Sequence, residues 1–374
     1  EDPEHRVARV GAVIGVLASH YRLVAKGKAS SYENADEQIA SIRAKLAAYS
    51  EAAEEFKDGL ALDDAGLADY LMDVTQRWSF VAQQDNDVVA DWLSFKFPNK
   101  RDFDELVHHE TINKGEFDVW MGALEHRRRR DGFKLTDPRY GQREVLSEVN
   151  HCIYCHERDT DSCSKGMRNK KTNTFKTDPL GVTTIGCPLD EKISEMHLVK
   201  RRGDNIGALA VIIVDNPMCP GTGHRICNEC MKGCIYQKTD PVNIPQIETN
   251  VLTDVLFMPY GFEIYSLLTR WNPLNVKRPA MLPYNGKNAL VVGLGPAGYT
   301  MSHYLLNEGF AVAAIDGLKL EPLPVELTGD ADNLPAPIEN FAELYEALDQ
   351  RILAGFGGVA EYGITAVSYT HLTL

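Results

Sequence analysis

The chain has 374 residues, of which 44% are hydrophobic and 25% charged, and its formal net charge at pH 7 is -14. This length suffices for two or three domains with a substantial core, and the composition is that of a globular protein. The negative charge disfavours nucleic acid and anionic membrane surfaces as main partners, and no apolar run reaches the length of a bilayer span.

Both ends of the chain read as cut ends. The first residues, EDPEHRVARV, lack an initiator Met and the charged-then-apolar pattern of a signal peptide, so we expect the chain to start within a protein. The last residues end in SYTHLTL, which resembles a translated sequencing-adapter tail. We therefore expect residues 367–374 to be a non-native tail.

Residues 1–135 are predicted to form a helical region, to which the sequence assigns no chemistry. Between residues 35 and 97, two segments carry apolar side chains at helical spacing, which predicts packing in a core. We expect residues 102–130 to be helical as well, with Arg127–Arg130 as a solvated helix end, where cations suit the helix dipole. The predicted core-facing residues are Ile39, Ile42, Leu46, Ala47, Leu67, Leu71, Val74 and Trp78.

The cysteines are confined to one part of the chain. All eight fall between residues 150 and 250. A disulfide-stapled secreted protein of this length would spread its cysteines more widely, whereas a metal-binding module concentrates them. They are Cys152, Cys155, Cys163, Cys187, Cys219, Cys227, Cys230 and Cys234.

Three kinds of site are compatible with these cysteines. A c-type haem would use Cys152, Cys155 and His156, but it leaves the other cysteines unexplained and requires export. A tetrahedral zinc site would combine Cys152 and Cys155 with Cys227 and Cys230. Two [4Fe-4S] clusters need about eight ligands, most of them thiolates. The number and the C-x₂-C and C-x₂-C-x₃-C spacings favour the clusters.

After a Pro-containing linker at 271–287, residues 288–316 read as one β-α-β unit. Residues 289–292 are predicted to be a short buried strand, and Asp316 closes the second strand. The helix between them is expected to end at Gly309, and its predicted packing face comprises Ala297, Met301, Tyr304 and Leu305.

The first strand is followed directly by G-x-G-x-x-G. Gly293 allows the tight turn, Gly295 lets the backbone approach a pyrophosphate, and Gly298 lets helix and strand pack closely. The helix N-terminus favours the pyrophosphate, and Asp316 can accept hydrogen bonds from a ribose hydroxyl. The predicted cofactor-binding residues are Gly293, Gly295, Pro296, Ala297, Gly298 and Asp316.

Residues 150–325 resemble the small chain of glutamate synthase, and the N-terminal part of dihydropyrimidine dehydrogenase shares this arrangement. The matching pieces are the first C-x₂-C, C-P-L with I-x-E within 187–195, D-N-P at 215–217, G-x-R-x-C at 223–227, and C-x₃-C before V-x-I-x₂-I-E at 242–248. The resemblance implies a helical domain with two [4Fe-4S] clusters, followed by an FAD domain and an NADPH domain.

The resemblance also implies which residues hold each cluster. One cluster would be bound by Cys152, Cys155, Cys163 and Cys234. The other would be bound by Cys187, Cys227, Cys230 and a side-chain oxygen donor at Glu248, with Cys219 as the rival fourth ligand.

The chain departs from the family pattern by a basic, polar insertion at 164–186, which we expect to be a surface loop. The insertion puts Cys163 in doubt as a ligand, and His156 is an alternative to it, although an exposed or supporting position for His156 is the simpler interpretation. Residues 207–215, GALAVIIVD, read as a strand from their β-branched content, but the resemblance implies a helix there, and we expect the helix.

The expected architecture is therefore multidomain. An α-helical region (1–135) precedes an α-helical two-cluster domain (136–270), the linker, and the first part of a Rossmann-like α/β FAD-binding domain (288–366). The expected function is the N-terminal portion of an iron–sulfur flavoprotein oxidoreductase in the cytoplasm. Electrons from NAD(P)H, bound in a part beyond this chain, would pass through FAD and the clusters to a partner subunit or domain. No catalytic acid or base can be nominated. The alternatives are a zinc-stabilised nucleotide-binding protein and a c-type haem protein.

Overall fold

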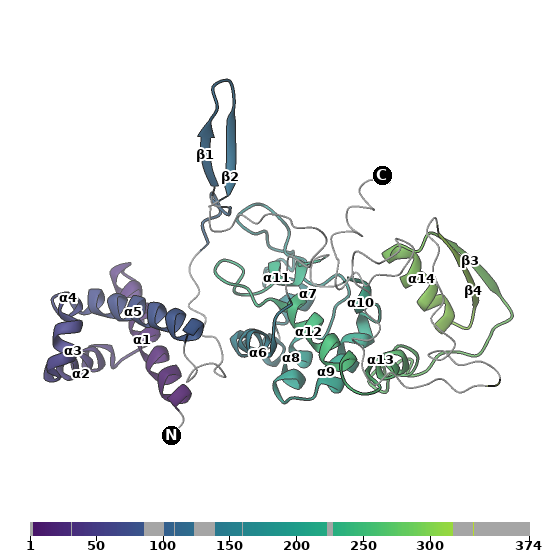
Figure 1. Cartoon of the computed structure of the whole chain (residues 1–374), viewed down its shortest axis with the longest axis horizontal. Coiled ribbons are helices and arrows are strands. Elements are labelled where there is room, and N and C mark those ends of the chain that lie inside the picture. Colours follow the sequence, from purple (N-terminus) through teal and green to yellow (C-terminus); the bar gives the residue numbers. More distant parts are fainter. Residues whose placement is uncertain are drawn as a thin grey trace. The chain divides into compact units, whose positions relative to one another are not determined.

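The structure is a computed structural model, which describes residues 3–30, 32–85, 101–107, 109–122, 139–158, 160–222, 227–316 and 332 (Figure 1). The chain divides into two compact units, one within residues 1–97 and one within residues 98–374, and each is described by itself. The arginine run at 127–130 and the expected tail at 367–374 lie outside the described residues.

The first unit is a helical bundle in which α1 (Pro3–Ala25) packs against α5 (Asp64–Asp85). The shorter helices α2 (Ala35–Ala48), α3 (Ser50–Glu55) and α4 (Lys57–Leu60) complete it. One apolar core joins α1, α2 and α5. It contains Ile14, Leu17, Ala18, Ala35, Ile39, Leu67, Ala68 and Leu71.

The predicted stripes of core residues are confirmed near their beginnings and wrong near their ends. Ile39, Leu67 and Leu71 are buried, whereas Ala47 is exposed and Trp78 is 45% exposed. On α5 the buried face continues instead through the small residues Ser79 and Ala82. Helical spacing predicted Trp78 as the buried residue, whereas the residue that is covered is its neighbour Ser79.

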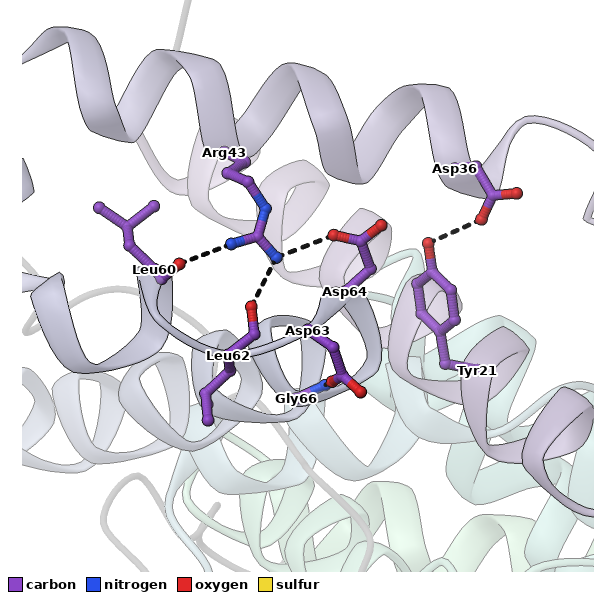
Figure 2. A network of polar contacts seen from close by, with 8 residues as sticks. All are labelled: Tyr21, Asp36, Arg43, Leu60, Leu62, Asp63, Asp64 and Gly66. Carbon is purple, nitrogen blue, oxygen red and sulfur yellow. Dashed lines mark hydrogen bonds and ion pairs between the residues drawn. The ribbon is translucent and has the colours of Figure 1, made fainter.

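Arg43 fastens the turn between α4 and α5 to α2, as Figure 2 shows. Its guanidinium donates hydrogen bonds to the carbonyl oxygens of Leu60 (2.7 Å) and Leu62 (2.9 Å) and to Oδ1 of Asp64 (2.8 Å). Leu60 is the last residue of α4 and Leu62 lies between α4 and α5, so helix bonds do not satisfy their carbonyls. Asp63 caps the start of α5 by accepting the Gly66 N–H at 2.7 Å.

Arg43→Ala is therefore expected to loosen this turn. It should lower the free energy of unfolding of the first unit by about 1–3 kcal/mol, because the two carbonyls and the Asp64 carboxylate lose their charged hydrogen-bond donor. Hydrogen–deuterium exchange of the amides of residues 60–66 measures the change. Lys57→Ala is the matched control, since its ion pair with Glu54 is exposed and such pairs contribute about 0–1 kcal/mol. Equal protection loss in both variants would contradict the assignment.

The second unit contains a β-hairpin where the sequence predicted helix, and this prediction was wrong. Strand β1 (His109–Asn113) pairs antiparallel with β2 (Asp118–Gly122). Its turn is closed by the Lys114 N–H, which donates to the Phe117 carbonyl at 2.9 Å, and Gly115 adopts a φ of +86°. This conformation at Gly115 favours a turn over a helix.

The helices that follow surround a second core. They are α6 (Gln142–His151), α7 (Ser162–Lys165), α8 (Ile193–Arg201), α9 (Asn205–Asp215), α10 (Cys219–Thr222), α11 (Glu229–Lys232), α12 (Ile244–Leu256) and α13 (Gly261–Arg270). Helix α9 packs against α8, α12 and α13, and Figure 1 shows it among them. Because neighbours surround it, α9 is apolar on all sides. Residues 207–215 are thus helical, as the resemblance implied and contrary to their β-branched content.

The end of the described chain is a β-α-β unit, as predicted. Strand β3 (Asn288–Val292) lies parallel to β4 (Ala311–Ile315), and α14 (Pro296–Asn307) connects them. Gly309 has a φ of +83° and ends the connection, also as predicted.

The predicted burial of this unit was partly wrong. Leu290 and Val292 of β3 are 64% and 75% exposed, and Met301 and Tyr304 of α14 are exposed as well. The alternation along β3 shows that one sheet face lies under a helix while the other is not covered in the described part of the chain. In α14 the buried residue is Tyr299.

Within the described ranges, no single helix combines the length and apolar composition needed to cross a bilayer; α12 and α13, bent by 116° where they meet, meet that criterion only as a pair.

Candidate metal centres and nucleotide-binding turn

Four cysteines that are far apart in the sequence line one cavity of the second unit. Cys152 and Cys155 come from the end of α6 and the turn after it, Cys163 from α7, and Cys234 from the segment after α11. We call these four residues the first cysteine group. They are the set that the resemblance implies for one cluster, so the structure brings that predicted set together.

Burial determines the protonation of the thiols in the first cysteine group. Burial raises the pKa of Cys152 to about 12 and that of Cys163 further, and the neighbouring thiols add to both shifts. These thiols therefore keep their protons while no cation is bound. Since thiolates are the metal ligands, a bound metal must replace those protons.

The insertion at 164–186 does not carry Cys163 away from the site. The Cys187 N–H donates to the Cys163 carbonyl at 2.8 Å, which closes the insertion at its base. Gly166 and Gly186 make this closure possible: a Cβ at Gly186 would lie 2.4 Å from the Gly166 nitrogen. The loop above the base is mostly exposed, as expected for a surface loop. The insertion therefore leaves Cys163 at the cavity with Cys152, Cys155 and Cys234.

Two further polar side chains line the same cavity, and sequence reasoning missed both. His197 is 0% exposed and Ser194 is 1% exposed, and both lie on α8. Among the described residues, the two ring nitrogens of His197 and the hydroxyl of Ser194 have no hydrogen-bond partner. Burial lowers the pKa of His197 to about 3, so the ring is neutral and carries one N–H. Buried donors normally have acceptors, so this donor set fits a cavity that holds a ligand with acceptor atoms, such as sulfide.

His156 is not part of this cavity lining. Its side chain is 59% exposed and pairs with Glu195, with 3.2 Å between Nδ1 and Oε1. With Asp161, these residues form a surface group whose ligand atoms lie within 4.8 Å of one another. His156 therefore occupies the exposed, supporting position that was the simpler of its two interpretations.

The remaining predicted ligands gather in a second place. Charge interactions link Cys230 with Cys187, Cys227 and Glu248, and each neighbour raises the pKa of Cys230 beyond the effect of burial. We call Cys187, Cys227, Cys230 and Glu248 the second ligand group. Cys227 is exposed whereas Cys230 is buried, so this group lies closer to the surface on one side.

Glu248 is half-buried beside a second carboxyl, the buried Glu191, that sequence reasoning missed. Loss of solvent raises the pKa of both carboxyls, and a hydrogen bond joins them. Asn216 hydrogen-bonds to Glu191 as well. The raised pKa favours a proton on Glu248, which must lose it to act as a metal ligand.

Cys219, the rival fourth ligand, lies beside this pair. Burial raises its pKa well above the usual range, and Glu248 and Glu191 raise it further. Cys219 also raises the pKa values of Tyr265 and Tyr299. It therefore lies between the carboxyl pair and two tyrosines, whereas Glu248 acts directly on Cys187 and Cys230.

No disulfide links any of the eight cysteines, all of which the structure describes.

The glycine-rich turn has the geometry that the motif predicts. Gly293 adopts a φ of +94°. A Cβ at Gly298 would lie 1.7 Å from the Gly293 carbonyl oxygen, so only glycine permits this approach of helix to strand. At Gly295 a Cβ would meet nothing within 4 Å, and no side chain caps the helix that starts there. The N–H groups at the start of α14 are thus available to an anion, and these residues fit a dinucleotide.

Asp316 lies at this turn, but its carboxylate has a further role. Oδ2 accepts the Leu294 N–H at 2.5 Å, between the first two glycines of the motif. The predicted site residue is therefore beside the turn and also fastens it to the end of β4.

Tyr299 connects the turn to helix α10. It lies in the first turn of α14 and is 8% exposed. Its hydroxyl lies 2.0 Å from the place where a Cβ on Gly221 of α10 would be, so the ring packs directly against that glycine. Because α10 starts at Cys219, the nucleotide turn is in contact with the segment that carries this cysteine.

Comparisons with known proteins give relatives but no family. No family model matches the chain. The chain is similar to two proteins of Rickettsia prowazekii (strain Madrid E): it is 55% identical over 148 residues to "Uncharacterized protein RP006" and 39% identical over 114 residues to "Uncharacterized protein RP005". These matches cover 40% and 29% of this chain, but only 20% and 35% of the relatives. The chain thus spans a fifth and about a third of the lengths of these relatives.

Proposed function

We propose that the chain is part of an iron–sulfur flavoprotein oxidoreductase. In this proposal the first cysteine group and the second ligand group each hold one [4Fe-4S] cluster, and the glycine-rich turn holds FAD. When bound, these groups supply one-electron and hydride chemistry. NAD(P)H would bind in a part of the protein outside this chain, and a partner subunit or domain would accept the electrons. The proposal includes two further points: that the chain is related to the family it resembles, and that the β-α-β unit is the start of a Rossmann-like domain.

One observation carries the proposal: Cys152, Cys155, Cys163 and Cys234 line a single cavity together with His197 and Ser194, whose polar side-chain atoms have no hydrogen-bond partner among the described residues. The number of cysteines favours clusters over zinc. One tetrahedral zinc site would use four of the eight cysteines, whereas two [4Fe-4S] clusters need about eight ligands, most of them thiolates.

The residues of the chain have distinct tasks in this proposal. The four thiols of the first cysteine group position one cluster in their shared cavity. Glu248 provides an oxygen ligand for the other, and Glu191 orients it. The N-terminus of α14 binds the pyrophosphate, and Tyr299 keeps the flavin-binding turn in contact with the segment that carries Cys219. Thiols without disulfides suit a reducing compartment, so we place the protein in the cytoplasm.

The proposal is tested on protein purified without oxygen, by its visible spectrum and by the iron, acid-labile sulfide, zinc and flavin content per chain. About eight irons and eight sulfides, with absorbance bleached by dithionite, are expected. One or two zincs without sulfide would overturn the proposal and favour the zinc-stabilised alternative. A pyridine haemochrome assay tests the haem alternative, which the exposed position of His156 does not favour.

A further inference from the structure

The buried histidine in the first cavity is not one of the proposed metal ligands, and its ring nitrogens lack hydrogen-bond partners among the described residues. His197 is fully buried on α8, and its two ring nitrogens have no hydrogen-bond partner among the described residues. Leaving a buried donor unsatisfied costs about 1–3 kcal/mol. A leucine in that position would avoid this cost, whereas the imidazole calls for an acceptor that the described residues do not provide.

The cavity itself identifies the kind of acceptor. His197 and Ser194 line it together with the four thiols of the first cysteine group. A ligand held by these thiols therefore occupies the space that the imidazole faces. Because the ring is neutral, it offers an N–H without adding a charge, and sulfur carrying negative charge is the acceptor that four thiolate ligands would bring there.

We propose that His197 donates a hydrogen bond to a sulfur of the cluster held by Cys152, Cys155, Cys163 and Cys234, and that this bond raises the reduction potential of that cluster. This inference rests on the proposed function. A hydrogen bond to sulfur stabilises the reduced form more, because that form carries the extra negative charge. His197 is a positioning and tuning residue here, not a ligand.

His197→Leu tests the inference, because leucine fills a similar volume without an N–H. In an EPR-monitored redox titration, the reduction potential of the first cluster should fall. We expect the equilibrium constant for its reduction to change about tenfold, which corresponds to 59 mV for a one-electron step. The cluster of the second ligand group is the internal control and should keep its potential. His197→Asn and His197→Gln, which place an amide N–H near either ring nitrogen, should restore part of the shift.

A second measurement needs no variant. With ¹⁵N-histidine in the otherwise unaltered protein, pulsed EPR of the reduced first cluster should show a nitrogen coupling. That coupling should persist in His156→Gln, because His156 lies outside the cavity lining. If His197→Leu loses its iron, this measurement decides the question.

The outcomes separate the inference from the proposed function. An unchanged potential in His197→Leu at unchanged iron content would overturn the inference, and so would a missing nitrogen coupling in the labelled protein. If the unaltered protein itself lacks iron and sulfide, the proposed function fails first, before any variant is made.

Discussion

Cys234→Ala is expected to lose about half of the bound iron and sulfide, from about eight atoms of each per chain to about four. Cys234 lines the cavity with Cys152, Cys155 and Cys163, so its loss removes one of four thiols from a single site. The second ligand group keeps all its members, and its cluster should remain. Iron and sulfide analysis of the anaerobically purified variant measures this.

Cys219→Ala is the matched control, since Cys219 is as buried as Cys234, at 5% exposure. With Glu248 as the fourth ligand, this variant should keep its full iron content, whereas Glu248→Ala should lose about four irons. The opposite pattern would make Cys219 the ligand. Equal iron content in Cys234→Ala and the unaltered chain would contradict the first cysteine group.

Gly298→Ala should disrupt the nucleotide-binding turn altogether. The added Cβ would lie 1.7 Å from the Gly293 carbonyl oxygen, which is backbone and cannot rotate away. We expect the β-α-β unit to lose several kcal/mol of stability, on the order of 3 or more, which places this change among the severe backbone effects. Hydrogen exchange of residues 288–316 should rise, and FAD should not bind.

Gly295→Ala separates folding from binding. Its Cβ meets nothing within 4 Å, and the φ of -66° at Gly295 suits alanine. Exchange of residues 288–316 should therefore stay as in the unaltered chain. The methyl group would occupy the space that a pyrophosphate needs against the backbone, so FAD affinity should fall about tenfold or more. If both variants bind FAD normally, the turn is not a nucleotide site.

Motifs with fixed spacing made the strongest predictions. The G-x-G-x-x-G turn, its two strands and the stop at Gly309 follow from local backbone requirements, which the sequence states directly. Cys163 and Cys234 could be joined only through the resemblance, because nothing local connects them. The structure shows how they meet: α7, which carries Cys163, packs against α11, which ends shortly before Cys234.

Other features depended on tertiary packing and gave no local signal. His197 reads as one polar residue in an amphipathic helix, and Glu191 as one of many surface acids; only burial reveals them. Trp78 and Val292 were predicted to be buried from their apolar character, yet each lies on the face of its element that no neighbour covers. The hairpin at 109–122 was missed although Gly115, a residue suited to its turn, lies between the two strands.

The first cysteine group also bears on how long the polypeptide survives in a cell. Its members come from α6, α7 and the segment after α11, so a bound cluster cross-links distant parts of the chain and removes freedom from the unfolded state. Without it, backbone hydrogen bonds hold the base of the exposed insertion, from the Cys187 N–H to the Cys163 carbonyl and from the Met167 N–H to the Thr184 carbonyl. Local opening there exposes the loop to proteases. Iron supply would then set the lifetime of the protein as well as its redox state.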